Sequence, residues 1–256
     1  MVQPGQPSKR AAAADIHVGC SGWAYKHWRG ILYPDGLPQA RWFERYAEDF
    51  DTVEINNSFY RLPPPATFEK WRTQAPADFL YAVKANRFIT QAKKLLDCGE
   101  PVARMMAAAR CLGDRLGPLL YQLPPSMKIN LGRLEAFLRI APRDTLNVFE
   151  FRDPSWYQPE TYALLAHHKA SFCVHDMAGS ATDRIAVGPA AYVRFHGGVG
   201  KYWGRYSSHA LRSWADWALG QRGEGRSVWF YFNNDIHGHA IHDARTLKSM
   251  VESSGS

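Results

Sequence analysis

The chain has 256 residues, of which 46% are hydrophobic and 21% charged, and its formal net charge is +7. This length suits one large domain or two small ones, and the composition is that of an ordinary globular protein. No apolar run approaches the ~18–20 residues that span a bilayer. The four cysteines are irregularly spaced without a C-x-x-C pair, so neither a disulfide framework nor a cysteine zinc site is supported.

The two ends of the chain differ from the rest. Residues 1–14 are rich in Pro, Gln, Ser and Ala and have no apolar periodicity. We expect a disordered tail there, then one domain over residues 15–253, and a frayed end at residues 253–256. With no disulfide pattern and no signal-peptide core, a reducing cytoplasm is the expected location.

Short β-rich segments alternate with longer segments of helical periodicity. The predicted strands, in chain order, are residues 16–19, 52–55, 80–83, 119–122, 147–151, 171–175, 191–195 and 228–232. The predicted helices are residues 39–50, 66–75, 101–112, 131–140, 159–168, 208–221 and 239–251. A loop with room for a short hairpin precedes the seventh strand, and Ser208 is a plausible N-cap for the helix that follows it.

This alternation predicts βαβ units and a parallel sheet. Eight units in about 240 residues predict a single (β/α)8 barrel of the TIM type. The alternative is a doubly wound open sheet, which requires a G-x-G-x-x-G fingerprint after an early strand. Gly19-Cys20-Ser21-Gly22 does not match that fingerprint, and no helix follows it at once.

Polar residues stand at nearly every predicted strand end, where TIM barrels carry their reactive groups. The candidates for catalysis are Glu54, Glu150, Asp176 and His196. The candidates for substrate binding are Lys84, Arg152, Arg194, Asn56, Trp23, Tyr60, Gln122, Asn233, Asn234 and Asp235. Charges inside a barrel are costly unless they are paired or used, so the alternative is a ring of ion pairs that only closes the barrel mouth.

Three basic candidates, Lys84, Arg152 and Arg194, suit a phosphate or carboxylate, which arginine binds bidentately. The glycine-rich loop at residues 196–201 could add a nest of backbone N–H groups for an anion. The alternative is a flexible loop with a solvated lysine. Aromatic residues beside basic groups can stack bases or sugars, and they equally suit loop packing.

Proton transfer would fall to the acidic residues and histidines. Glu54 or Glu150 is the expected base, and Asp176 or His196 the expected acid. Histidines that satisfy buried hydrogen bonds are the alternative. Glu150, His175, Asp176 and His196 are also metal-ligand types, but the nearby arginines and Lys84 would repel a cation. We therefore assign no metal ligands, and the identity of any cofactor is left open.

Ordered motifs along the chain carry a family resemblance. They are Gly19-Cys20-Ser21-Gly22-Trp23, Glu54-Ile55-Asn56-Asn57-Ser58-Phe59-Tyr60, Val83-Lys84-Ala85-Asn86-Arg87, Gln122-Leu123-Pro124-Pro125, Glu150-Phe151-Arg152, Tyr192-Val193-Arg194-Phe195-His196 and Tyr231-Phe232-Asn233-Asn234-Asp235. Together they resemble the YecE-like family, domain of unknown function seventy-two, over residues 16–251. The resemblance implies a TIM-type barrel and no known reaction. Two residues depart from the family pattern: Gln91 stands where a histidine is expected, and His175 where an apolar residue is expected.

The leading hypothesis is an enzyme that acts on a phosphorylated or otherwise anionic substrate, such as nucleic acid or a sugar phosphate, at the C-terminal mouth of the barrel. Its class is left open among hydrolase, lyase and isomerase. One alternative is a protein that binds single-stranded nucleic acid or an anionic metabolite without turnover. Another is a metal-dependent hydrolase. We expect a monomer whose partner is an anionic small molecule or single-stranded nucleic acid, with no membrane partner.

Overall fold

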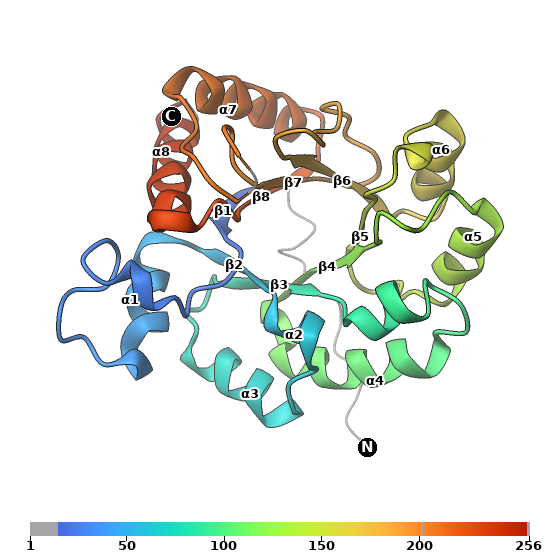
Figure 1. Ribbon diagram of the computed structural model, residues 1–256. Coiled ribbons are helices and arrows are strands. Elements are labelled where there is room, and N and C mark those ends of the chain that lie inside the picture. The colour runs from blue at the N-terminus through green and yellow to red at the C-terminus, as the bar shows by residue number, and fades with distance from the viewer. Residues whose placement is uncertain (1–14, 201, 255–256) are drawn as a thin grey trace.

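Eight parallel strands close into one barrel in the computed structural model, which describes residues 15–200 and 202–254. The strands follow one another around the barrel in chain order, as Figure 1 shows. They are β1 (Ile16–Cys20), β2 (Thr52–Ile55), β3 (Leu80–Lys84), β4 (Leu116–Gln122), β5 (Asn147–Glu150), β6 (Ser171–Asp176), β7 (Ala190–Phe195) and β8 (Ser227–Phe232). The predicted (β/α)8 barrel is therefore confirmed, and the open-sheet alternative is wrong.

Helices form the outer ring in Figure 1. The longer ones are α1 (Trp42–Asp49), α3 (Pro65–Gln74), α4 (Gly99–Ala109), α5 (Leu131–Ile140), α6 (Pro159–His167), α7 (Ser208–Gly223) and α8 (His239–Ser254). Short helical segments, α2 (Asn57–Tyr60), η1 (Lys26–Trp28), η2 (Gln39–Arg41), η3 (Phe88–Ala92), η4 (Arg110–Arg115), η5 (Pro154–Trp156) and η6 (Ile236–Gly238), lie between them. None of the helices in the described ranges is both long and apolar enough to cross a bilayer.

Two local predictions are wrong. The segment between β6 and β7 contains no hairpin within residues 177–189. The N-cap of α7 is Ser207, whose hydroxyl accepts a hydrogen bond from the amide of Ala210. Of the end predicted to fray, Ser253 and Ser254 are the last two residues of α8. The tail predicted at residues 1–14 and the last two residues lie outside the described residues.

The shortest pairing between neighbouring strands joins β1 and β2, where one residue pair, Cys20 and Val53, is in register. The phenol of Tyr46 on α1 reinforces this seam. It accepts a hydrogen bond from the Cys20 amide at 2.8 Å and donates one to the Thr52 carbonyl at 2.9 Å. A Cβ on Gly19 would lie 2.2 Å from that carbonyl oxygen, so only glycine permits this approach.

A cluster of buried apolar and aromatic residues fills the barrel interior on the N-terminal side of the charged strand ends. The buried residues there are Leu80, Ala82, Leu120, Val148, Cys173, Ala190, Tyr192, Trp229 and Tyr231. Trp229 stacks on His17 at the start of β1, with ring centroids 4.1 Å apart. Strand residues alternate between the two faces of a sheet, so the inner-facing positions beyond this layer fall at the C-terminal strand ends. Those positions hold the charged residues.

Candidate functional site

The inner-facing residues at the C-terminal ends of β2 to β7 are Glu54, Lys84, Gln122, Glu150, His175 and Arg194. Neighbouring strands set them side by side, since Gln122 is in register with Glu150 and His175 with Arg194. The sequence places these residues far apart along the chain, and barrel closure gathers them.

Arg194 occupies the centre of this arrangement. Its Nη2 lies 2.8 Å from Oε1 of Glu54, and its Nη1 lies 2.7 Å from Oε2 of Glu150. Nη1 also lies 3.4 Å from Oε1 of Gln122, and Nε lies 3.2 Å from Oε1 of Glu54. Only 1% of Arg194 is exposed. Its guanidinium therefore organises two carboxylates rather than facing an incoming ligand.

Glu54 accepts several further hydrogen bonds. The hydroxyl of Ser21 donates to Oε1 at 2.8 Å, the phenol of Tyr192 donates to Oε2 at 2.7 Å, and the amide of Asn56 donates to Oε1 at 3.1 Å. Burial would raise the pKa of Glu54, but the charges of Arg194 and Lys84 and the Tyr192 hydrogen bond outweigh it and lower the pKa. Glu54 is an ionised, saturated acceptor.

Glu150 is held in the same way. It forms ion pairs with both Arg194 and Arg152 and is completely buried. Burial opposes its ionisation, yet Arg152 and Arg194 together hold the pKa of Glu150 well below its usual value. Both carboxylates thus stay negative at neutral pH.

His196 lies beyond the end of β7, next to Arg152. Its Nε2 is 3.0 Å from Nη2 of Arg152, and its Nδ1 is 3.2 Å from the side-chain amide of Asn233. Burial and the charge of Arg194 lower the pKa of His196 strongly, so the ring is neutral. Because a guanidinium can only donate, Nε2 accepts and the ring proton lies on Nδ1, which requires Asn233 to present its oxygen there.

His175 is also neutral. Its Nε2 lies 3.3 Å from the hydroxyl of Ser180, and burial lowers its pKa to about 4. Neither histidine adds positive charge to the mouth at neutral pH.

Lys84 is the remaining cation of the mouth. Its Nζ lies 4.2 Å from the ring centroid of Phe59, and 8% of the residue is exposed. The ion pairs among these residues join Arg194 to Glu54 and Glu150, and Arg152 to Glu150; none of those described includes Lys84. Burial and, next, the charge of Arg194 lower the pKa of Lys84 to about 8.

Helix α2 holds Phe59 against Lys84. The hydroxyl of Ser58 donates to the carbonyl of Lys84 at 2.7 Å, and the side-chain amide of Asn86 donates to the carbonyl of Ser58 at 2.8 Å. These two bonds tie α2 to the end of β3, near which it lies in Figure 1. The ring beside the amine is therefore part of the site.

We call Glu54, Lys84, Glu150, Arg152 and Arg194 the charge cluster. It contains three cations and two carboxylates, so its net charge is positive when Lys84 is protonated. Gln122, His196, Asn56 and Asn233 from the predicted set touch this cluster or its neighbours. The structure thus brings together most of the residues that the strand-end rule selected.

Asp176, one of the predicted acids, lies outside the charge cluster. It follows His175 on β6 and so faces the opposite side of the sheet, where its neighbours are Arg184 and Trp214. Burial raises the pKa of Asp176. Strand alternation alone separates it from the mouth.

Three predicted binding residues have structural contacts elsewhere. Asp235 accepts from the indole of Trp28 and pairs with His27 at 2.8 Å. The amide of Asn234 donates to the Gly204 carbonyl at 3.0 Å and to Asp243 at 2.8 Å. Trp23 packs edge-on against Phe43 and Trp71. Tyr60, in contrast, is 68% exposed at the rim.

Sequence reasoning omitted Tyr192 and Phe59 from the candidates, whereas Ser21 follows the first predicted strand and falls under the strand-end rule. Tyr192 lies two positions before Arg194 on β7, so strand alternation puts both on the inner face. That periodicity was the available signal for Tyr192. Phe59 falls within the motif at residues 54–60, but its place beside Lys84 depends on the short helix α2.

Two backbone amides of the anion nest predicted after β7, those of Gly197 and Gly200, already donate hydrogen bonds within the protein. The Gly197 amide donates to the phenol of Tyr206 at 3.1 Å, and the Gly200 amide donates to the Trp203 carbonyl at 3.2 Å. Lys201 lies outside the described residues. Within the described ranges, no group of three or more His, Cys, Asp or Glu side chains is arranged to hold a metal ion.

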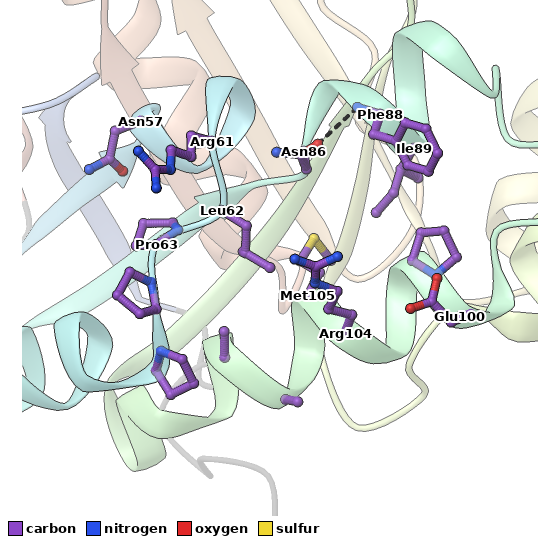
Figure 2. Close-up of a pocket in the computed structure, with 15 residues that line it drawn as sticks. Asn57, Arg61, Leu62, Pro63, Asn86, Phe88, Ile89, Glu100, Arg104 and Met105 are labelled. Carbon is purple, nitrogen blue, oxygen red and sulfur yellow. Dashed lines mark hydrogen bonds between the residues drawn. The ribbon is translucent and has the colours of Figure 1, made fainter.

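A side pocket of about 940 Å³ lies apart from the charge cluster, between the α2–α3 connection and α4. Figure 2 shows Arg61 and Arg104 among its lining residues, with Leu62 and Met105 on its apolar wall. No member of the charge cluster lines it. The side pocket and the charge cluster are therefore separate places in the fold. The charge cluster is the candidate functional site, because its ionisable groups converge.

Comparisons with known proteins agree with one another. The sequence profile of the family described as "Protein of unknown function DUF72" matches residues 17–256. The UPF0759 protein YunF of Bacillus subtilis is 24% identical over 93% of this chain and 95% of its own length. The UPF0759 protein YecE of Escherichia coli K12 is 28% identical over 56% of this chain and 50% of its own length.

Solved structures share the fold. A DUF72 family protein from Thermotoga maritima has a TM-score of 0.82 and 28% identity, and the match covers 93% of this chain and 99% of that one. A DUF72 family protein from Enterococcus faecalis has a TM-score of 0.77 at 16% identity, covering 93% and 95% of the two chains. None of these four descriptions names a reaction.

Proposed function

The chain belongs to the DUF72 family of proteins of unknown function, and from that premise we propose that it is an enzyme acting on an anionic substrate at the C-terminal mouth of its barrel. The anion is a carboxylate or phosphate, and its main ionic contact is Lys84. The observation that carries this proposal is the charge balance of the cluster.

Each arginine of the charge cluster is already paired with a carboxylate. Lys84 forms no salt bridge among those described, although its charge is felt by Glu54. A buried cation without a direct counter-ion is costly, and a substrate anion would supply the missing partner. This supports one anionic group on the substrate, placed beside Lys84.

Arg152 supplies further donors. Its Nη1 lies 3.5 Å from the sulfur of Met177, a weak acceptor, and its buried Nε has no hydrogen-bond partner among the described residues. Arginine N–H groups bind carboxylate and phosphate with good geometry. Arg152 is therefore the second contact to the anion in this proposal. Arg194 has a different role, because it positions the carboxylates of Glu54 and Glu150.

Proton transfer belongs to Lys84 in this scheme. Glu54 and Glu150 have lowered pKa values and are engaged by arginines, which makes both poor bases near neutral pH. His196 is neutral with a strongly lowered pKa. Lys84, with a pKa of about 8, exchanges a proton in the range where general acid–base catalysis is efficient.

The test is binding of inorganic phosphate, pyruvate and a nucleoside monophosphate by calorimetry, over a range of ionic strengths. The Lys84→Gln variant should lose at least about ten-fold in affinity for the anion that binds, the equivalent of one strong charge-assisted contact. Lys70→Gln is the matched control, because Lys70 is an exposed lysine on α3. Equal affinity in wild type and Lys84→Gln would refute the proposal.

A second candidate function is binding of single-stranded nucleic acid without turnover, and the rim favours it. Tyr60 is 68% and Phe88 52% exposed, and both line a hollow of about 520 Å³ together with Arg87. Exposed aromatic rings beside cations can stack bases while holding phosphates. Oligonucleotide binding that weakens steeply with salt, together with no product, would favour this candidate over the enzyme.

A further inference from the structure

Lys84 combines two features that favour a reactive amine. It lies on the inner face of β3, and it is 8% exposed. The ring of Phe59, 4.2 Å from Nζ, fixes the position of the amine, although this cation–π contact stabilises the protonated form. Two carboxylates influence it electrostatically, but neither forms a salt bridge with it. An ordinary structural lysine at this depth would be expected to have a carboxylate in direct contact.

Desolvation and nearby cations favour the neutral amine, which is the nucleophilic form. Both are present here: burial is the larger influence on Lys84, and Arg194 and Arg152 add to it. Glu54 and Glu150 act in the opposite direction, so the amine gains and loses its proton near neutral pH instead of remaining in one state.

We propose that Lys84 is a catalytic nucleophile that forms an imine with the carbonyl carbon of a 2-oxo acid. The inference rests on the proposed function, because the carboxylate of the oxo acid would take the proposed anion position, which Lys84 and Arg152 both contact. A 2-oxo acid fits both features, since its carbonyl carbon is bonded directly to its carboxylate carbon. One contact places the anion and brings the carbonyl toward Nζ.

The step balances in atoms and charge. The ammonium of Lys84 first gives one proton to solvent, and the neutral Nζ adds to the carbonyl carbon. The nitrogen's second proton moves to the former carbonyl oxygen, which gives a carbinolamine. That hydroxyl regains the solvent proton and leaves as water while the C=N bond forms. Overall, one ammonium and one ketone give one protonated imine and one water.

The charge cluster suits the product as well as the reactant. The protonated imine keeps the single positive charge of Lys84, so Glu54 and Glu150 still face three cations. The substrate carboxylate can then be held by the donors of Arg152 that lack strong acceptors. The ammonium at the start and the protonated imine at the end carry the same charge, so the completed step leaves the net charge of the Lys84 nitrogen unchanged in its buried place.

The experiment is reductive trapping on the full chain. The protein is incubated with pyruvate and sodium borohydride, digested and mapped by mass spectrometry. A carboxyethyl group on Lys84 is the expected adduct. At about pH 7.5, an amine with a pKa of about 8 is neutral about two hundred times more often than an ordinary exposed lysine, so Lys84 should be labelled far ahead of Lys70.

Two controls separate the inference from the proposed function. The Lys84→Arg variant keeps the charge and should lose the adduct, and L-lactate, which has the carboxylate but no carbonyl, should slow trapping in wild type. If lactate binds but pyruvate gives no adduct on Lys84, the imine is refuted while the anion site stands. If neither acid binds, both proposals fail. Adducts spread evenly over the exposed lysines would also refute the imine.

Discussion

Arg194 and Glu54 form a buried ion pair inside the barrel, with Nη2 and Oε1 2.8 Å apart and at most 1% of either side chain exposed. The same guanidinium contacts Glu150 on the other side. Two carboxylates and the central arginine thus stabilise each other without solvent. Because both glutamates engage Arg194, the cations of the charge cluster that can contact a ligand are Lys84 and Arg152.

Replacing Arg194 with Gln should destabilise the protein strongly. The change leaves Glu54 and Glu150 buried next to each other with one fewer cation, which costs about 3–5 kcal/mol for a broken buried pair. The measurement is the free energy of unfolding in urea. Arg41→Gln is the control, because Arg41 pairs with Glu44 on the exposed surface and its loss should change little. A similar small effect for both variants would contradict the assigned role of Arg194.

Replacing Lys84 with Met should stabilise the protein while it abolishes anion binding. The pKa of Lys84 is lowered to about 8, so the protonated amine is held at a cost in the folded state, and removing it should raise the free energy of unfolding by about 1–3 kcal/mol. Residues kept for function often cost stability in this way. Urea unfolding of Lys84→Met against wild type measures the change. A large loss of stability would mean that Lys84 is a structural member of the cluster.

Stability should fall as the pH drops from about 6.5 toward about 4, and His175 should account for part of the loss. Burial lowers the pKa of His175 to about 4 in the folded state, so the unfolded chain binds its proton more readily. The contribution is fully present above pH ~6.5, decreases as the pH falls through that window, and amounts to up to about 3 kcal/mol.

The measurement is the free energy of unfolding of wild type and His175→Gln at several pH values. The difference between the two proteins should shrink as the pH falls, because the glutamine does not titrate. A difference that is constant over this range would show that His175 does not titrate as inferred.

Replacing Tyr192 with Phe should weaken the protein and raise the pKa of Glu54. The phenol donates to Oε2 of Glu54 at 2.7 Å, and a buried hydrogen bond to a charged group contributes about 1.5–3 kcal/mol. Glu54 has a lowered pKa, so its contribution is lost as the pH falls from its ordinary value through the folded value. In this variant the folded pKa is higher, so the contribution is smaller and its loss is complete at a higher pH. Acid unfolding followed by circular dichroism measures both effects.

Tyr231→Phe is the matched control for that variant. Its phenol lies 2.7 Å from the neutral hydroxyl of Thr52 and does not bond Glu54. It should cost less stability and leave the acid midpoint nearly unchanged. An equal shift of the midpoint in both variants would contradict the role given to the Tyr192 hydrogen bond.

Local sequence patterns were sufficient for the elements of this protein. Strand segments such as residues 52–55 and the helix at residues 131–140 have the predicted bounds, because each has a clear period and clear breakers. The strand-end rule then selected Glu54, Lys84, Glu150 and Arg194 without knowledge of any contact. The segment between β6 and β7 was mispredicted because it has no strong period of its own.

Only the tertiary structure decided which of the charged strand-end residues pair with one another and which lie outside the mouth. Asp176 was separated from the mouth by the face of its strand, and Asp235 by a hydrogen bond from Trp28, a residue far away in the chain. Pairing Arg194 with both glutamates, and leaving Lys84 beside Phe59, depends on four strands and a short helix meeting after the barrel closes. Sequence periodicity predicts which face of a strand or helix a residue occupies. The ion-pair and hydrogen-bond partners of that residue depend on long-range packing, which cannot be predicted from the residues next to it in the sequence.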